Sequence, residues 1–327
     1  MILILSRQDD GSTALVIQWL IAMKKPYIRL NADSANTRFI SMDPARRELI
    51  IEQDGVRMNI FDVESVWYRR RGISEMNLIA DDTNYAHGVF PDDEQFCRKH
   101  ISAETRTLVE FIHSVVEGNS RRSIGSHLSV DVNKLKVLQM AAECGLKTPR
   151  SFIVSTKQDL EDKIKAHHHV ITKAISGQGV YFPTRQHHYY SYTEKLTLAS
   201  TKHLPEVFFP SLIQTEIKKR LELRVFYLKG TFYTMAIFSQ GDKKTSVDFR
   251  KYNKKKPSRL VPYLLPALIQ EKLRTLLDRL NLDTGSIDLI VDTNNDYYFL
   301  EVNPIGQFSM TSMPCNYYLE KKIAQIL

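Results

Sequence analysis

Several features that commonly define a protein class are scarce or missing in this chain of 327 residues. Only three cysteines occur, Cys97, Cys144 and Cys315, and their spacing fits no metal-ligand motif, so a reduced, cytoplasmic protein is expected. No run approaches the ~20 apolar residues that a membrane-spanning helix needs, and the opening residues turn acidic too soon for a secretory signal. The sequence also lacks a Walker-type phosphate loop, zinc-finger spacing and internal repeats. Neither a membrane nor a nucleic-acid partner is therefore expected.

Charge is unevenly distributed along the chain. The net charge is +8, and much of the excess lies between Gln240 and Arg259, where eight basic residues face only Asp242 and Asp248. A solvated loop explains such a stretch, and so does a surface that attracts an acidic partner.

The length exceeds the ~100–200 residues of a usual domain, so two or three packed units are expected. A strand at 1–5, a helix at 13–23 and a strand at 26–30 form a β-α-β opening, which predicts an α/β fold with a parallel sheet. Chain composition places domain boundaries near residues 125 and 210, which divides the chain into 1–125, 126–210 and 211–327. Further predicted elements are a hairpin around Asp54-Gly55, a long helix at 92–117, a helix at 131–143 capped by Asp131 and closed by Gly145, and helices at 262–280 and 313–326.

The most informative segment is SIDLIVDTNNDYYFLEVNP, residues 286–304. Two apolar runs flank Asn294-Asn295, which predicts a hairpin with Asp288 opposite Glu301. Because side chains alternate along a strand, Asn303 points the same way as Glu301, while Ile287, Leu289, Leu300 and Val302 point to a core. Two facing carboxylates and an amide oxygen suit a hard cation such as Mg²⁺. A hairpin whose polar face meets only water is the plainer alternative.

Two lysines stand where phosphate contacts are plausible. Lys173 ends the strand 170–173 just before Gly177-Gln178-Gly179, a small glycine loop whose backbone N–H groups can cover phosphate oxygens. Lys134 lies near a predicted helix N-terminus, where a cation is mildly unfavourable unless it pairs with an anion. Solvent-exposed lysines explain both positions equally simply.

A third segment, residues 211–228, is an apolar strand ending at Gln214, a short polar stretch, and a second strand with Glu222 and Arg224 on one face. Free backbone groups at such a strand end can bind an adenine edge, and a nearby carboxylate can bind ribose hydroxyls. Arg224 can neutralise a developing phosphate or carboxylate charge. The alternative is an edge strand with an ordinary surface ion pair.

In this order, the segments resemble the ATP-grasp superfamily of ligases. The resemblance implies an N-terminal α/β domain followed by central and C-terminal domains that hold ATP between them. It assigns Mg²⁺ to Asp288, Glu301 and Asn303, although Thr215 stands where the family's hinge often has an acidic residue. It assigns ATP binding to seven residues: Lys134, Lys173, Gln214, Thr215, Glu216, Ile217 and Glu222.

Residues 67–70 (WYRR), 221–224 (LELR) and 248–250 (DFR) are similar to the maturases of ω-ester-containing peptides, the microviridin-type graspetide ligases. This narrower resemblance implies a precursor peptide as partner, with a leader that is recognised, in the region of residues 181–192 by resemblance, and an acidic core. Asp or Glu side chains of the core would be phosphorylated, and Thr, Ser or Lys would close lactones or lactams. Arg224 and Arg250 are then expected beside the acyl-phosphate, and Asp248 is the candidate base. A homodimer is suggested by the resemblance alone.

Two other functions remain open on the sequence. One is an ATP-grasp ligase for another carboxylate, adding an amino acid to a protein or joining small molecules. The other is a basic scaffold or nucleic-acid-binding protein with a degenerate nucleotide site. The first differs from a macrocyclase in its product, because ring closure removes one water per linkage and adds no residue.

Overall fold

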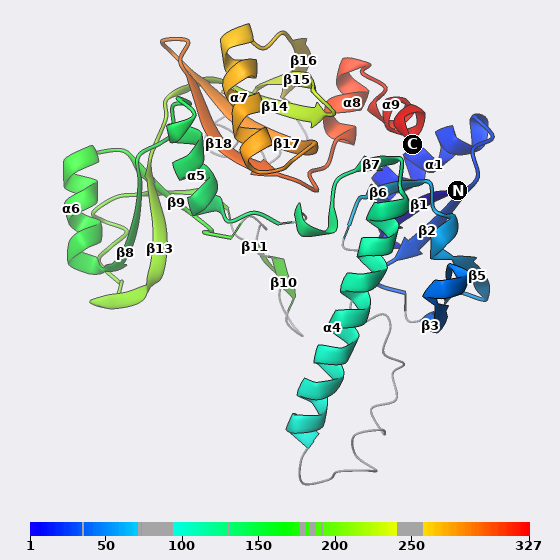
Figure 1. Cartoon of the computed structure of the whole chain (residues 1–327). Helices are drawn as coiled ribbons and strands as arrows, with labels where there is room; N and C mark the ends of the chain where they lie inside the picture. Colours follow the sequence, from blue (N-terminus) through cyan, green and yellow to red (C-terminus); the bar gives the residue numbers. More distant parts are fainter. Residues whose placement is uncertain are drawn as a thin grey trace. The chain divides into compact units, whose positions relative to one another are not determined.

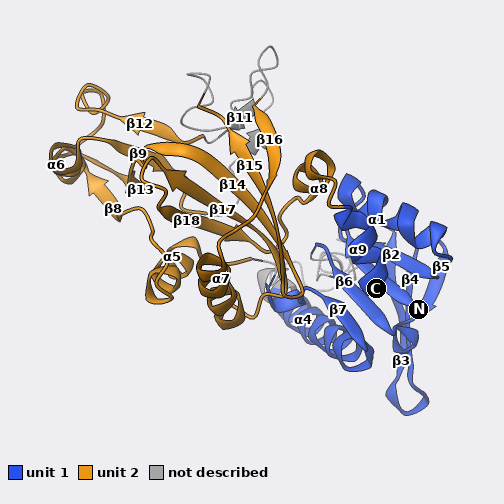
Figure 2. Cartoon of the chain, turned by 90° about the horizontal axis from the view of Figure 1, so that it is seen from above, with its two compact units in different colours: residues 1–130, 318–327 blue, residues 131–317 orange. Residues whose placement is uncertain are grey.

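The structure is a computed structural model of the whole chain, and it describes residues 1–34, 36–70, 73, 94–129, 131–176, 181–183, 188–190, 192–240 and 258–327. For residues 94–98, 181–183 and 188–190 it describes the backbone only. Two compact units are separated by their internal contacts, residues 1–130 with 318–327 and residues 131–317 (Figure 2). Compactness thus separates two units, and the division into 1–125, 126–210 and 211–327 stays a prediction.

Unit 1 is built around a parallel sheet of order β2-β1-β6-β7 (Figure 1). Its central strand β1 is entirely buried, as expected for a strand covered on both faces. The strands are β1 (Ile2–Ser6), β2 (Tyr27–Asn31), β6 (Ser65–Tyr68) and β7 (Arg122–Ile124), and the helices are α1 (Gly11–Ala22), α4 (Glu94–Asn119) and α9 (Leu319–Ile326). The predicted β-α-β opening is confirmed, and so is the long helix, which begins at Glu94.

A smaller antiparallel sheet, β3-β4-β5, completes unit 1. Asp54 and Gly55 connect β4 to β5 with φ values of 52° and 81°, the left-handed conformation that a tight hairpin turn requires. The predicted hairpin is therefore confirmed. The remaining elements are β3 (Thr37–Asp43), β4 (Glu48–Gln53), β5 (Val56–Asn59) and the short helices η1 (Pro44–Arg46), η2 (Ile60–Asp62) and η3 (His127–Ser129).

Unit 2 contains two larger sheets, of order β12-β9-β13-β8 and β16-β15-β14-β17-β18, and the small hairpin β10-β11. Helix α6 packs on the first sheet through Leu160 and Ile164, and α5 and α7 supply leucines and valines to the core on the second. The strands are β8 (Ser151–Thr156), β9 (Val170–Lys173), β10 (Tyr181–Pro183), β11 (His188–Tyr190), β12 (Glu194–Leu196), β13 (Val207–Thr215), β14 (Lys219–Leu228), β15 (Thr231–Phe238), β16 (Arg259–Tyr263), β17 (Thr284–Asp292) and β18 (Tyr297–Asn303). The helices are α5 (Lys134–Glu143), α6 (Lys157–His167), α7 (Ala267–Arg279) and α8 (Ser309–Cys315).

Two predicted helices are wrong in extent. The helix expected at 262–280 begins only at Ala267, because Pro262 and Tyr263 belong to β16 and pair with β15. The helix expected at 313–326 is interrupted: α8 ends at Cys315 and α9 begins at Leu319, and Asn316 and Tyr318 adopt φ values of 53° and 51° between them. No helix among the described residues is long and apolar enough to span a membrane.

Candidate active site

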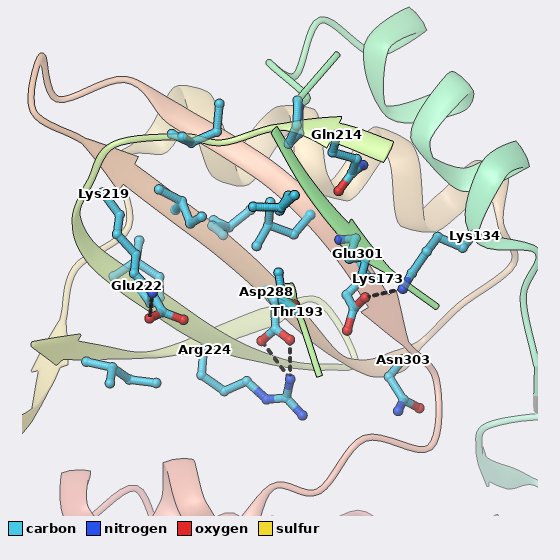
Figure 3. A pocket seen from close by; sticks show the side chains of 18 of the residues that line it. Lys134, Lys173, Thr193, Gln214, Lys219, Glu222, Arg224, Asp288, Glu301 and Asn303 are labelled. Carbon is cyan, nitrogen blue, oxygen red and sulfur yellow. Dashed lines mark hydrogen bonds and ion pairs between the residues drawn. The ribbon is translucent and has the colours of Figure 1, made fainter. Parts of the chain in front are cut away.

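A pocket of about 400 Å³ lies between the two larger sheets of unit 2 (Figure 3). Strands β9 and β13 contribute Lys173 and Gln214 from one side, and β14, β17 and β18 contribute residues from the other. The predicted site residues that line it are Lys134, Lys173, Gln214, Thr215, Ile217, Glu222, Arg224, Asp288, Glu301 and Asn303. The structure therefore brings most of the predicted set into one cavity.

Three charged residues form a row across neighbouring strands of the second sheet. Arg224 of β14 is the register partner of Asp288 in β17, and Asp288 is the register partner of Glu301 in β18. The predicted juxtaposition of the two carboxylates is confirmed by this register. Ser286 pairs with Asn303 two residues further along, so the amide stands on the same face as the carboxylates.

Each carboxylate of this row has its own cationic partner. Nη1 of Arg224 donates to both oxygens of Asp288 at 2.6 Å, and Nζ of Lys134 lies 2.8 Å from Oε2 of Glu301. Burial raises the pKa of Asp288 against the pull of Arg224, with Glu301 adding to the rise. Burial also opposes ionisation of Glu301, but Lys134 and Lys173 together hold its pKa below its usual value.

The alternation predicted for β18 fails at Leu300. A bulge lies between Asp288 and Leu289, so that Asp288 pairs with Glu301 but Leu289 pairs with Phe299. Phe299 takes the core position, fully buried, and Leu300 lines the pocket. A bulge inserts one residue into one strand and re-aims its side chain, and here it gives the pocket an apolar wall beside the charged row.

Lys134 is the first residue of α5, and its helix is capped by Asn133, not by Asp131 as predicted. Oδ1 of Asn133 accepts the N–H groups of Leu135 and Lys136 at 3.0 and 3.1 Å. The predicted end of the helix at Glu143 is confirmed, and Gly145 follows with a φ of 75°. Lys134 is held at this terminus by Glu301 and by the carbonyl oxygen of Ala174, 3.4 Å away. These anionic and carbonyl partners explain a cation at an otherwise unfavourable helix end.

The predicted adenine hinge lies at the end of β13. The side chain of Gln214 is buried, and its Nε2 donates to Oγ of Ser151 at 2.8 Å. Its Oε1 is buried without a hydrogen-bond partner in the described part of the chain, and the residue lines the pocket. A buried acceptor left unpaired costs free energy, so a donor on a ligand would stabilise it there.

Glu216 differs from its hinge neighbours. Its carboxylate lies 2.6 Å from Nζ of Lys195, and the residue is not among those that line the pocket. Thr215 lines the pocket, with its Oγ1 accepting the N–H of Arg150 at 3.2 Å. The side chain of Glu216 is therefore turned to Lys195, and its neighbours Thr215 and Ile217 line the pocket in its place.

Glu222 is held by two residues that the sequence did not single out. Nζ of the buried Lys219 donates to its Oε1, and Oγ of Ser239 donates to the same oxygen at 2.8 Å. Burial raises the pKa of Glu222, and Lys219 and Ser239 counteract that rise. Lys219 and Glu222 come together because the register of β14 shifts between Lys219 and Leu221, which their spacing alone did not indicate.

Three predicted features fall outside the described residues. They are Asp248, Arg250 and the glycine loop Gly177-Gln178-Gly179. Most of the basic stretch that ends at Arg259 is outside as well. The leader region expected near residues 181–192 is described only as the backbone of β10 and β11 and the residues from Tyr192.

The donors in the pocket fit a nucleotide with Mg²⁺. Two carboxylate groups and one amide oxygen are the oxygen ligands that Mg²⁺ takes, with the remainder supplied by phosphates and water. Lys134 and Lys173 lie on the same side as these oxygens and suit phosphate, and Ile171, Ile217 and Leu300 give an apolar wall suited to a base. The charged row has two carboxylates, and no group of three or more histidine, cysteine or acidic side chains that could hold a metal ion is found among the described residues.

Comparison with known proteins finds solved structures that share this fold. No protein-family model and no curated protein matches the sequence, but solved structures match along its whole length. An ATP-grasp ligase associated with ribosomal peptides in Chryseobacterium gregarium, solved with ADP and a leader and core peptide, has a TM-score of 0.77 at 22% identity and covers 99% of this chain and 94% of its own. The macrocyclase MdnC of Microcystis aeruginosa, bound with its precursor peptide MdnA, has a TM-score of 0.76 at 25% identity over 100% and 99%.

The ATP-grasp ligase PsnB, solved with a minimal precursor, Mg and ADP, matches with a TM-score of 0.71 at 14% identity over 99% of this chain and 95% of its own. The chain therefore has the ATP-grasp fold, which confirms the fold expected from the sequence. The expected likeness to ligases of ribosomal peptides is confirmed as well, because it extends over all the domains of those enzymes.

Proposed function

We propose that this protein is an ATP-dependent ligase that phosphorylates Asp or Glu side chains of a ribosomally made precursor peptide and closes lactone or lactam rings. The observation that carries the proposal is the row Arg224–Asp288–Glu301, with Lys134 and Lys173 beside it, in one pocket. This combination of carboxylates and cations suits a nucleotide with its metal, and it occurs in a fold shared over nearly the whole chain with ATP-grasp enzymes that were solved with peptides of this kind of pathway.

Asp288, Glu301 and Asn303 would hold Mg²⁺ in this pocket. When bound, the metal ion supplies positive charge that offsets the repulsion between a carboxylate nucleophile and the γ-phosphate. Lys134 and Lys173 would bind phosphate oxygens of ATP. Lys134 now pairs with Glu301, and a phosphate can take the place of that carboxylate as the partner of its ammonium group.

The reaction then needs little further chemistry from the protein. A substrate carboxylate oxygen bonds to the γ-phosphorus and ADP leaves; a hydroxyl or amine of the peptide attacks the carbonyl carbon and gives up its proton to a base, and phosphate leaves. Arg224 would hold the acyl-phosphate, because its Nη1 already lies among the pocket's carboxylates and its Nε is buried with no hydrogen-bond partner among the described residues. Gln214 Oε1 is a fitting acceptor for an amino group of the base, and Glu222 for ribose hydroxyls. Arg250 and Asp248 stay proposed as a second anion contact and a base.

The partner is proposed to be an acidic core peptide joined to a leader. The three structural neighbours cited above were solved with a leader and core peptide, a precursor peptide and a minimal precursor. The basic stretch between Gln240 and Arg259 would attract an acidic core, with an attraction that weakens as salt rises. A cytoplasmic location and a homodimer remain predictions made from the sequence.

The decisive experiment is mass spectrometry of a candidate precursor peptide incubated with the protein, ATP and Mg²⁺. We expect the peptide to lose the mass of one water per linkage. Asp288→Asn should abolish both the mass loss and ADP release, whereas Asp278→Asn on the exposed side of α7 should leave them intact. A gain in mass equal to an amino acid would instead establish an amino-acid ligase, and unchanged ATP turnover in Asp288→Asn would refute the assigned site.

A further inference from the structure

The turn that follows Asn303 is unusually close to the neighbouring strand. Gly306 donates its N–H to the carbonyl oxygen of Asn303 at 3.0 Å, which closes a turn over Pro304 and Ile305. A Cβ placed on Gly306 would lie 2.2 Å from Cβ and 2.4 Å from Oγ of Ser286. Contacts this short do not occur between real side chains, so position 306 has room for glycine only while Ser286 stays in place.

Space alone accounts for this glycine. The φ of Gly306 is not in the left-handed region that favours glycine, unlike those of Gly55, Gly125, Gly145 and Gly230. An alanine could therefore adopt the same backbone conformation, and any effect of Gly306→Ala would come from the clash with β17.

The turn closed by Gly306 holds the side chain of Asn303 in place. Oδ1 of Asn303 accepts the N–H of Ile305 at 3.0 Å, within the same turn. An amide oxygen has two lone pairs, so this bond orients the oxygen and leaves one lone pair for a ligand, and Asn303 lines the pocket. Asn303 is exposed, and without the turn its side chain would be free to rotate.

The turn is also anchored beyond Gly306. Oγ of the buried Ser286 donates to the carbonyl oxygen of Gln307 at 3.3 Å, and Phe308 is buried against Phe226, with ring centroids 5.3 Å apart. Ser286 is itself the register partner of Asn303. The serine thus contacts the turn on one side and stands beside Asn303 on the other.

We propose that Gly306 and Ser286 are positioning residues. Because both are small, the turn can lie against β17, and this placement holds the amide oxygen of Asn303 where it can serve as a metal ligand. This inference rests on the proposed function, because it assigns no metal of its own. Substituting Gly306 should displace the turn, release Oδ1 of Asn303 and weaken metal binding, with no direct loss of a metal ligand.

The test measures the binding of Mn²⁺ to the full chain by electron paramagnetic resonance, in the presence of a non-hydrolysable ATP analogue. Gly306→Ala should weaken Mn²⁺ binding about 10-fold or more, the usual range for groups that orient a ligand. The Mg²⁺ concentration needed for half-maximal turnover should rise by a similar factor. The control Gly11→Ala, where a Cβ meets nothing within 4 Å, should leave both quantities unchanged.

A second substitution separates positioning from misfolding. Ser286→Gly removes both atoms nearest to the new methyl group, so Gly306→Ala combined with Ser286→Gly should recover part of the lost Mn²⁺ affinity. Recovery would be partial because the carbonyl oxygen of Asn303 still lies 3.1 Å from the added Cβ and because the hydrogen bond from Ser286 to Gln307 is lost. Thermal unfolding of each variant shows whether it is folded.

The outcomes distinguish the proposed function from the positioning role of Gly306 and Ser286. A wild-type protein that binds no Mn²⁺ with the nucleotide would overturn the proposed function. If the wild type binds Mn²⁺ and the Gly306→Ala variant is folded and binds Mn²⁺ equally strongly, only the positioning role would be overturned. A double variant that regains stability but no affinity would overturn it too.

Discussion

A buried histidine in unit 1 offers a measurable effect of a single residue. The rings of His113 and His127 are stacked, with centroids 4.5 Å apart and planes at 3°. His113 is almost fully buried, its Nδ1 lies 3.4 Å from the hydroxyl of Tyr68, and its Nε2 lies 3.2 Å from the carbonyl oxygen of Ile73. Burial, together with the neighbouring His127, lowers the pKa of His113 to about 4, although Ile73 and Glu117 act in the opposite direction.

This depressed pKa predicts that unit 1 loses stability in acid. Between pH 6.5 and 4 the unfolded chain binds a proton at His113 that the folded chain does not, so stability falls as the pH falls through that window. By pH 4.5 the loss should reach about 2–3 kcal/mol relative to neutral pH. Trp19 and Trp67 are the only tryptophans in the sequence and both lie in unit 1, so urea unfolding followed by their fluorescence reports on this unit.

Other groups titrate in the same window, so variants isolate the contribution of this histidine. His113→Gln keeps a donor for the carbonyl oxygen of Ile73 and removes the titration, and its stability should depend less on pH than that of the wild type. The exposed His100→Gln in α4 serves as the control and should follow the wild type. Parallel pH profiles for wild type and His113→Gln would contradict the prediction.

At the same scale, the sequence predicted some site residues better than others. Asp288 and Glu301 were placed opposite each other because hairpin register follows from a turn and alternating side chains. The bulge that turns Leu300 into the pocket was not predicted, since one extra residue leaves little trace in an alternating pattern. The partners of these acids, Arg224 and Lys134, come from β14 and α5. Their pairing depends on tertiary packing that spacing does not encode.

Helix α5 is the element that carries Lys134 into the pocket, and its start depends on one cap. Asn133→Ala removes the acceptor for two backbone N–H groups and should destabilise the protein by about 1 kcal/mol. Because Lys134 is the next residue, nucleotide affinity should fall as well. Thermal unfolding and calorimetric titration with the ATP analogue measure the two effects.

Asp131→Ala is a well-matched control for this element. Asp131 is the cap that the sequence predicted, but among the described residues its side chain accepts the N–H of Val132, which lies outside the helix. Its replacement should change stability and nucleotide affinity little. Equal losses in the two variants would mean that the cap does not set the position of Lys134.

Strands were predicted unevenly. Strand β9 has the predicted bounds, and the predicted hairpin of residues 286–304 forms β17 and β18, whereas short β7 and β12 were missed and edge strand β16 was absorbed into a helix. Local patterns favour a helix across 262–266, but pairing with β15 places Pro262 and Tyr263 in a strand. Asn316 adopts the left-handed conformation that asparagine tolerates at a helix end, but the same conformation is uncommon for a tyrosine such as Tyr318, so the gap between α8 and α9 was missed.

At the scale of the whole molecule, residues 318–327 return to the compact unit formed by residues 1–130. Helix α9 packs on α1 with Leu319, Ile323 and Ala324 buried. Nζ of Lys25 donates to the carbonyl oxygens of Ala324 and Gln325 at 2.9 and 3.2 Å, which satisfies groups at the end of the helix. Nothing in the sequence of 318–327 indicated that it returns to the first unit.

Removing a side chain from this returning helix should therefore destabilise the opposite end of the sequence. Ile323→Ala leaves a cavity in a fully buried position and should cost about 2–4 kcal/mol in the tryptophan-reported unfolding of unit 1. Gln325→Ala, on the exposed side of the same helix, should cost almost nothing. If Ile323→Ala lowered the stability of unit 2 alone and left the tryptophan fluorescence transition unchanged, the assignment of α9 to unit 1 would be contradicted.

The return of residues 318–327 to unit 1 affects how the protein folds during synthesis. Domains usually fold in order as they leave the ribosome, but the first unit here lacks α9 until residues 319–326 have been synthesised. The flank of α1 on which α9 packs therefore stays uncovered while the second unit is being synthesised. Nascent chains stalled before residue 318 would leave that flank without its partner helix, and a premature stop before residue 318 would damage the unit that begins at residue 1.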